Sequence, residues 1–250
     1  NPYLSGGTKD IESSSLVIEA LGGYDPTGAM IARLAADIPT VSNGGISGDL
    51  TSITWKLKPG VMWSDGTPFT SADVVFTADY CIGEPGCYQE AKFEGVKSVD
   101  AVDDLTVKIT FEKPMPNPYG PFVGSQTPIL QKAQFQNCTG TKRQECTTEN
   151  FGPVGTGPFV VTDFKPNDVI QMKANENYRE AGKPRFATLV FKGGGDAAGA
   201  GRAVMETGEY DHAWNLQLAP EVIKQMAEGG KGKPVSGFST AVERLEMNMT

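Results

Sequence analysis

The strict alternation of apolar and polar side chains over residues 105–111 is the strongest constraint that this sequence places on its fold. Successive side chains of a strand point to opposite faces, so Leu105, Val107, Ile109 and Phe111 predict a strand with one buried face. A second alternating run, over residues 52–58, predicts another half-buried strand. Sheet structure is therefore expected in this half of the chain.

A helix is predicted between these two strands. Thr70 at the N-cap and Asp73 at position N3 resemble a capping box, in which the two side chains bond each other's backbone N–H groups. The predicted helix runs from Ser71 to Tyr80. Its apolar side chains, which we expect to be buried, are Val74, Val75, Ala78 and Cys81.

The other elements follow from periodicity and from helix breakers. Helical spacing predicts a helix over residues 10–21 and a short helical or irregular segment at 31–35. Five prolines between Pro114 and Pro128 exclude regular structure there. Strands are predicted at 159–164, 169–173 and 187–192, and helices at 196–207 and 220–227. The mixture predicts an α/β protein of mixed α+β character.

Composition excludes several classes of protein. The chain has 250 residues, of which 39% are hydrophobic and 21% charged, as in ordinary globular proteins. Its 22 Lys and Arg against 30 Asp and Glu leave a formal net charge of −8, and no basic run is present. Because nucleic-acid binding needs clustered cations, we expect no nucleic-acid partner. No stretch of about 18 apolar residues predicts a membrane span.

Four cysteines form two local pairs, Cys81 with Cys87 and Cys138 with Cys146. Each pair brackets a turn-rich interval, which favours two small-loop disulfides made in an oxidising compartment. Four free thiols in a reducing compartment are the alternative. The spacings are not those of a zinc site and the single histidine, His212, is far away, so we expect no metal.

The sequence offers little catalytic machinery. It has no Gly-x-Ser-x-Gly elbow, and the paired thiols are better explained as structural. Asp103 and Asp104 suit a hairpin turn, because short carboxylates bond their own backbone. We therefore predict a protein that is not an enzyme, has no catalytic residues and needs no cofactor.

A glycine-rich motif is the strongest indication of a nucleotide site. Residues 193–198 satisfy G-x-G-x-x-A between a predicted strand and a predicted helix. No regular β-α-β series flanks the motif, and a strand-to-helix turn with Asp196 near the helix N-terminus explains it without a ligand. A nucleotide-binding enzyme stays as the weaker hypothesis.

Two short segments have the chemistry to contact a ligand. The run Ser5–Thr8 exposes backbone groups with which an extended peptide could pair, as in strand addition, although a flexible loop would look the same. Trp214 and Asn215 set a flat apolar ring beside an amide, which suits an amphipathic small molecule; a buried core tryptophan is the alternative.

Taken together, these segments resemble a known family. The run from Trp55 to Phe76 closely resembles the signature region of family 5 extracellular solute-binding proteins, the dipeptide- and oligopeptide-binding components of ABC importers. Further segments match that family in order and spacing over essentially the whole chain: Asn1-Pro2, Ser5–Thr8, Pro153–Phe159, Asn175 to Tyr178, and Gly208–Asp211 running into Trp214-Asn215.

The resemblance implies a two-lobed, type II periplasmic-binding-protein fold that closes on its ligand. By this analogy residues 1–22 and 155–240 belong to the first lobe, 23–154 form an inserted subdomain, and 241–250 begin the second lobe. The alternating run Arg244–Thr250 is expected to be a strand cut at its end, so that the chain is a fragment. Such a fragment is expected to bind peptide weakly or not at all, because half of the cleft would be missing.

The resemblance also implies a site, partners and a location. Gly6, Gly7 and Thr8 match the stretch whose backbone pairs with bound peptide, and Trp214 and Asn215 match the segment that lines the cleft. The expected partners are a peptide or other small solute and the ABC permease, outside the inner membrane in the periplasm or extracellular space, with or without a membrane tether. Nickel chelates, oligosaccharides and opines are the alternative solutes.

Overall fold

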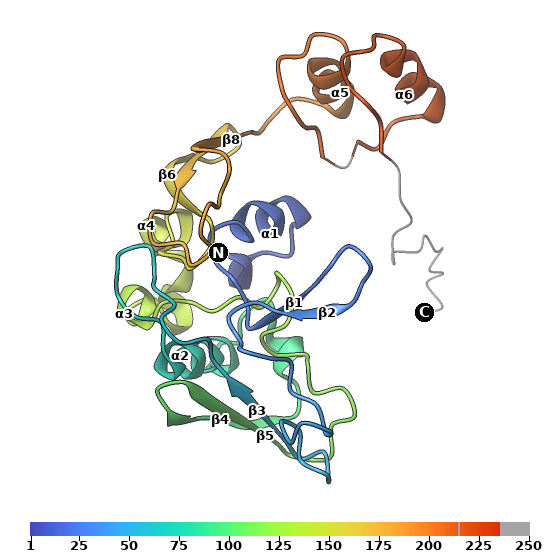
Figure 1. The fold of residues 1–250 in the computed structure, drawn as a ribbon. Helices are drawn as coiled ribbons and strands as arrows, with labels where there is room; N and C mark the ends of the chain where they lie inside the picture. Colours follow the sequence, from blue (N-terminus) through green and yellow to red (C-terminus); the bar gives the residue numbers. More distant parts are fainter. Residues whose placement is uncertain (215, 236–250) are drawn as a thin grey trace, which may run out of the picture. The chain divides into compact units, whose positions relative to one another are not determined.

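The computed structural model describes residues 1–214 and 216–235 (Figure 1). The chain divides into two compact units, Asn1–Lys192 and Gly193–Thr250, and each is described by itself. The predicted terminal strand Arg244–Thr250 lies outside the described residues. Among the helices that are described, none is long and apolar enough to cross a bilayer.

An antiparallel sheet with strand order β3-β5-β4 organises the lower part of the first unit (Figure 1). Its strands are β3 (Ser52–Lys56), β4 (Val96–Asp103) and β5 (Thr106–Phe111). Ile53 lies opposite Ile109 and Trp55 opposite Val107, and all four side chains are fully buried. Both alternating runs are therefore strands, as predicted, and their apolar faces meet in one core.

Helix α2 (Ser71–Ile82) packs against β4 and β5 of this sheet. Its capping box forms: the backbone N–H of Thr70 donates to the Asp73 carboxylate over 3.1 Å. Asp73 also accepts the backbone N–H of Lys132 at 2.9 Å and the indole N–H of Trp63 at 3.3 Å. Burial raises the pKa of this carboxyl, and the hydrogen bonds from Lys132 and Thr70 lower it by less. One short carboxylate thus joins three segments of the core.

A second antiparallel sheet, β6-β7-β8, consists of β6 (Phe159–Lys165), β7 (Val169–Ala174) and β8 (Thr188–Lys192). All three were predicted from the sequence to within two residues at each end. A small hairpin of β1 (Gly22–Tyr24) and β2 (Met30–Ala32) completes the strands described. Residues 114–128 contain no helix and no named strand, as their prolines predict.

The helix predicted over residues 10–21 is wrong in its second half. Helix α1 spans only Thr8–Ser14, because the Ser14 and Ser15 hydroxyls bond the carbonyls of Ile11 and Glu12 and compete with the helix backbone. Residues 16–21 instead leave the helix through a turn and continue without regular structure, with Val17, Ile18, Ala20 and Leu21 buried in the core. Of the two alternatives predicted for residues 31–35, the helical one is wrong: Ile31 lies in β2, residues 33 and 34 are irregular, and Ala35 pairs with Leu57.

Two glycines let another segment approach residues 16 and 17 closely. Gly157 donates its N–H to the Val17 carbonyl over 2.8 Å, and Phe159 donates to Leu16 over 3.0 Å. A Cβ atom at Gly155 would lie 1.8 Å from the Val17 oxygen, and one at Gly157 would lie 2.6 Å from the Leu16 oxygen. Only glycine permits this backbone contact.

Both predicted disulfides are present, Cys81–Cys87 and Cys138–Cys146. The first closes the loop after α2, and the second spans the 3-10 helix η3 (Gly140–Gln144) and ends just before α4 (Thr147–Phe151). The other short helices are η1 (Pro2–Leu4), η2 (Glu90–Phe93) and α3 (Lys132–Phe135). Cys81 and Cys138 are buried in the main core, so these bridges do more than close surface loops.

The second unit contains helices α5 (Ala197–Met205) and α6 (Pro220–Ala227), which pack on each other. Met205 and Met226 are buried. Gly201 allows the approach, since a Cβ there would lie 3.0 Å from the Met226 sulfur. Both helices were predicted. The range predicted for α6 matches the structure, whereas the range predicted for α5, 196–207, is one residue too long at its start and two at its end.

Replacing Asp73 by alanine tests the junction beneath α2. We expect Asp73→Ala to lower the free energy of unfolding by about 3 kcal/mol, because it leaves the buried indole N–H of Trp63 and the part-buried N–H groups of Thr70 and Lys132 without their acceptor. The control is Asp79→Ala, an exposed carboxylate on the same helix, which should change stability by less than about 0.5 kcal/mol. Equal losses in urea unfolding would show that the junction is unimportant.

Candidate functional site

The expected peptide-pairing segment lies between η1 and α1. Gly7 is the N-cap of α1, and its carbonyl accepts the N–H groups of Asp10 and Ile11 at 3.0 and 3.2 Å. Its own N–H donates to the Ser5 hydroxyl, which in turn donates to Asp10 over 2.7 Å. The helix start thus uses both polar groups of the Gly7 backbone.

Gly6 differs from its neighbour. It is exposed, and within the part of the chain that the structure describes its N–H and C=O make no hydrogen bond. One donor and one acceptor are therefore available for an extended partner, which is the requirement for strand-like pairing. Thr8 is the first residue of α1.

The ring of Tyr88 lies directly against Gly6. A Cβ atom added to Gly6 would come within 2.4 Å of that ring, so the contact requires glycine. Tyr88 is 65% exposed, and its backbone N–H is held by the Tyr3 carbonyl at 2.9 Å. An exposed aromatic ring beside free backbone groups is a typical surface for binding an amphipathic molecule. Nothing in the sequence singles out Tyr88, because a single tyrosine after a cysteine carries no motif.

A cavity of about 200 Å³ is lined in part by Leu4, Ser5 and Asp10, which flank Gly6 in the chain. Its floor is apolar and comes from β6, β7 and α4, whereas Ser5 and Asp10 contribute to a polar edge. Among its walls, Phe151 stacks on Phe164 with ring centroids 4.5 Å apart. The segment around Gly6 therefore contacts an exposed aromatic ring through Gly6 and lines a largely apolar cavity through Ser5.

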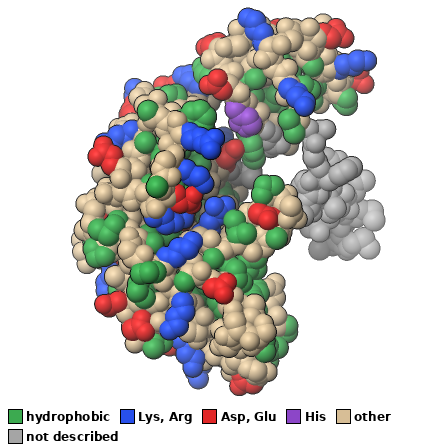
Figure 2. Space-filling model, in the orientation of Figure 1, with side chains coloured by type: hydrophobic (Ala, Val, Ile, Leu, Met, Phe, Trp, Pro, Cys, Tyr) green, Lys and Arg blue, Asp and Glu red, His purple; other side chains and the backbone are tan. Residues whose placement is uncertain are grey.

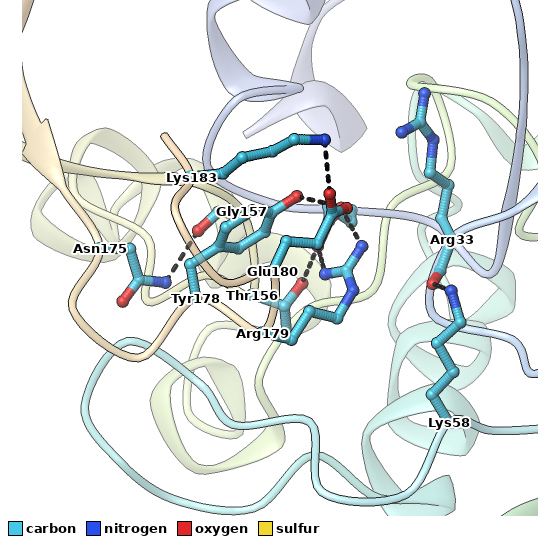
Figure 3. A network of polar contacts seen from close by, with 10 residues as sticks. Arg33, Lys58, Thr156, Gly157, Asn175, Tyr178, Arg179, Glu180 and Lys183 are labelled. Atoms are coloured by element: carbon cyan, nitrogen blue, oxygen red, sulfur yellow. Dashed lines mark hydrogen bonds and ion pairs between the residues drawn. The ribbon is translucent and has the colours of Figure 1, made fainter. Parts of the chain in front are cut away.

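A buried ion pair joins distant parts of the first unit (Figure 3). Arg179 donates two hydrogen bonds to the Glu19 carboxylate, at 2.5 and 2.8 Å, and Thr156 donates a third at 3.1 Å. Burial lowers the pKa of Arg179, but the hydrogen bonds and charge of Glu19 outweigh it and raise that pKa overall. The pair ties residue 19 to the chain between β7 and β8.

Tyrosine and acidic side chains extend this network. Tyr178 donates to Glu180 over 3.2 Å, and Glu180 pairs with Lys183 at 2.7 Å (Figure 3). Burial, followed by the negative charge of Glu19, raises the pKa of Tyr178 to about 12. Hydrogen bonding from Lys183 lowers the pKa of Glu180. The phenol therefore stays protonated and acts as a donor at neutral pH.

Two cations near this network have no ion pair among the described residues, Arg33 and Lys58. Lys58 donates to the Arg33 carbonyl over 2.7 Å (Figure 3). Burial and then the charge of Arg179 lower the pKa of Lys58. Lys and Arg side chains also gather on one face of the first unit (Figure 2). This local excess of positive charge runs against the net charge of −8 and favours carboxylate-bearing ligands.

The remaining expected site residues belong to the second unit. Trp214 is 43% exposed, so its ring is available at the surface, whereas Asn215 lies outside the described residues. Because each unit is described by itself, the expectation that Trp214 and Gly6 share a cleft stays a prediction.

The alternative sites have structural explanations. Asp196 caps α5 by accepting the N–H of Gly199 at 2.7 Å, so the glycine-rich motif forms an ordinary helix start. Cys138, Cys146 and Glu149 have metal-like spacing, but both sulfurs are in a disulfide and are not thiolate ligands. His212 is exposed.

This fold is found in solved solute-binding proteins. The sequence model of the bacterial extracellular solute-binding proteins, family 5 Middle, matches residues 30–250, and the chain belongs to this family. The family resemblance inferred from the sequence is thereby confirmed, as is the prediction that the protein is not an enzyme.

Individual relatives agree with this assignment. The glutathione-binding protein GsiB of Pectobacterium atrosepticum is 26% identical over 251 residues, which are 100% of this chain and 46% of that protein. The oligopeptide-binding protein AppA of Bacillus subtilis, solved with a nonapeptide, superposes with a TM-score of 0.68 at 28% identity, covering 84% of this chain and 40% of that one. MoaA of A. tumefaciens R10, solved with mannopinic acid, gives a TM-score of 0.70 at 26% identity, covering 84% and 41%. The chain spans less than half the length of these relatives.

Replacing Glu19 tests the ion pair. We expect Glu19→Gln to lower the free energy of unfolding by about 3–5 kcal/mol, because it leaves the buried Arg179 charge unpaired. Glu180→Gln is the control: its pair with Lys183 has side chains 39% and 57% exposed, and its loss should cost at most about 1 kcal/mol. Thermal unfolding of both variants measures the difference, and comparable losses would contradict this account.

Proposed function

We propose that this chain is part of the substrate-binding component of an ABC importer that captures di- or oligopeptides. The observation that carries the proposal is the free backbone donor and acceptor of Gly6 beside the exposed ring of Tyr88, in a member of this family. Main-chain pairing recognises a peptide without reading its sequence, so it suits a binder of diverse peptides.

The domain organisation belongs to the same proposal. Residues 1–22 and 155–240 form the first lobe, 23–154 an inserted subdomain, and 241–250 the start of a second lobe. Ligand capture brings Gly6, Gly7 and Thr8 from one side and Trp214 and Asn215 from the lobe junction against the peptide. The lobes then close and present the ligand to a membrane permease, outside the inner membrane. Two disulfides agree with an oxidising location.

A second candidate ligand is a non-peptide carboxylate such as an opine. The MoaA likeness at 26% identity and the unpaired cations Arg33 and Lys58 favour it. Peptides and opines both carry carboxylates, so charge alone does not separate them. Nickel chelates and oligosaccharides are further possibilities in the family, whereas the capped start of α5 argues against a nucleotide.

Native mass spectrometry of the full-length protein, purified without denaturation, identifies the ligand class. We expect copurified masses that correspond to a mixture of short peptides. A single mass matching an opine, a sugar or a nickel complex would replace the peptide proposal.

Substitution at Gly6 tests the site itself. We expect Gly6→Ala to weaken binding of trialanine by the full-length protein at least about tenfold, because the new methyl group displaces Tyr88 and disturbs the pairing backbone. Gly48→Ala is the control, since nothing lies within 4 Å of a Cβ added there. Isothermal calorimetry measures both, and unchanged affinity in Gly6→Ala would remove Gly6 from the site.

A further inference from the structure

Arg143 is a buried cation without an acidic partner. The residue is 4% exposed, and among the described residues no carboxylate lies within ion-pair distance of its guanidinium. Its Nε atom has no hydrogen-bond partner. Burying a charge in this way is costly unless backbone dipoles replace the lost water. The groups that Arg143 contacts should therefore matter.

The hydrogen-bond partners of Arg143 are backbone carbonyls in and next to the Cys81–Cys87 loop. Arg143 belongs to the Cys138–Cys146 loop, and its guanidinium donates to the carbonyls of Tyr80, Gly83 and Pro85 at the end of α2 and in the Cys81–Cys87 loop. It also lies 4.8 Å from the centre of the Tyr80 ring. A cation at a helix C-terminus bonds its last carbonyls and complements its dipole. Arg143 thereby joins the two disulfide loops.

Residues that follow each disulfide loop contact the segment 1–7. After Cys87, Tyr88 donates its N–H to Tyr3 at 2.9 Å and its ring covers Gly6, while the Gln89 amide donates to the Pro2 carbonyl at 3.4 Å. These contacts come from the two residues that follow the cysteine.

The second disulfide reaches the same segment by another route. Asn150, four residues after Cys146, donates to the Arg143 carbonyl at 2.7 Å and accepts from the Asn1 side chain at 2.9 Å. The Asn1 amide also donates to the Tyr80 hydroxyl at 3.2 Å, and its oxygen accepts the N–H of Tyr3 at 3.1 Å. Both routes converge on the residues that precede Gly6.

We infer that the two disulfide loops, joined by Arg143, form one support that positions Gly6 and Tyr88 for the ligand. Arg143 is a positioning residue, because it touches neither Gly6 nor a ligand and acts through Tyr80 and the loop that carries Tyr88. The ligand part of this inference rests on the proposed function, whereas the mechanical coupling between the loops and residues 1–7 does not.

Hydrogen exchange of the ligand-free, full-length protein tests the coupling. We expect Arg143→Ala to raise amide exchange in residues 1–14 by about tenfold or more, with no change in β3 and β5. Lys142→Ala, the exposed neighbour in the same loop, should change neither. An unchanged rate in residues 1–14, or an equal rise in β3 and β5, would overturn the coupling.

A second variant covers the case in which Arg143→Ala does not fold. Cys138→Ser with Cys146→Ser opens one loop far in sequence from residues 1–14, and the same rise in exchange is expected there. A change confined to residues 138–150 would overturn the inference.

Binding of trialanine then tests the consequence for the ligand. We expect Arg143→Ala to weaken binding by 5- to 150-fold, the usual range of coupling between sites, with Lys142→Ala unchanged. By reciprocity, the factor by which saturating trialanine shifts the dithiothreitol midpoint for reducing the disulfides should equal the ratio of its affinities for the oxidised and the reduced protein. Faster exchange with unchanged affinity would overturn the positioning role. If the wild-type protein binds no trialanine, the peptide proposal fails, while the exchange result still decides the coupling.

Discussion

The largely buried, non-helical segment at residues 16–21 is the constraint on which the first unit depends. Its backbone bonds three separate parts of the chain: Val17 accepts from Gly157, Glu19 from Ile129, and Leu21 from Arg33. A buried peptide group must find a partner, so each of these contacts defines where another segment runs. The glycines opposite it are required for the same reason, since a side chain there would separate the two backbones.

Polar side chains then secure what this backbone arrangement brings together. The carboxylate of Glu19 leaves the same segment and meets Arg179, while Asp73 collects donors from Thr70, Trp63 and Lys132. In both cases one acidic group satisfies several buried donors at once. Such networks favour one arrangement of the chain over others, because an arrangement that left some of the buried polar groups unpaired would be less stable than an apolar contact.

The candidate site combines these features at the edge of the core. The backbone N–H and C=O of Gly7 are both hydrogen-bonded at the start of α1, so of these two glycines only Gly6 has free backbone groups among the described residues. Tyr88 reaches Gly6 from a loop more than eighty residues away, held by a disulfide and by Tyr3. The position of a ligand-binding segment thus depends on packing that lies outside it.

The sequence by itself determined the features that depend on residues close together in the chain. Alternation predicted β3 and β5, Thr70 and Asp73 predicted the capping box, short turn-rich intervals predicted both disulfides, and the Trp55–Phe76 run indicated the family. Tertiary structure decided the rest. Residues 16–21, predicted to be helical, form a non-helical segment of the core. Tyr88 contacts Gly6, and Arg143 donates to the carbonyls of Tyr80, Gly83 and Pro85. These contacts join residues far apart in the chain, and no local spacing encodes which distant backbone will need a partner.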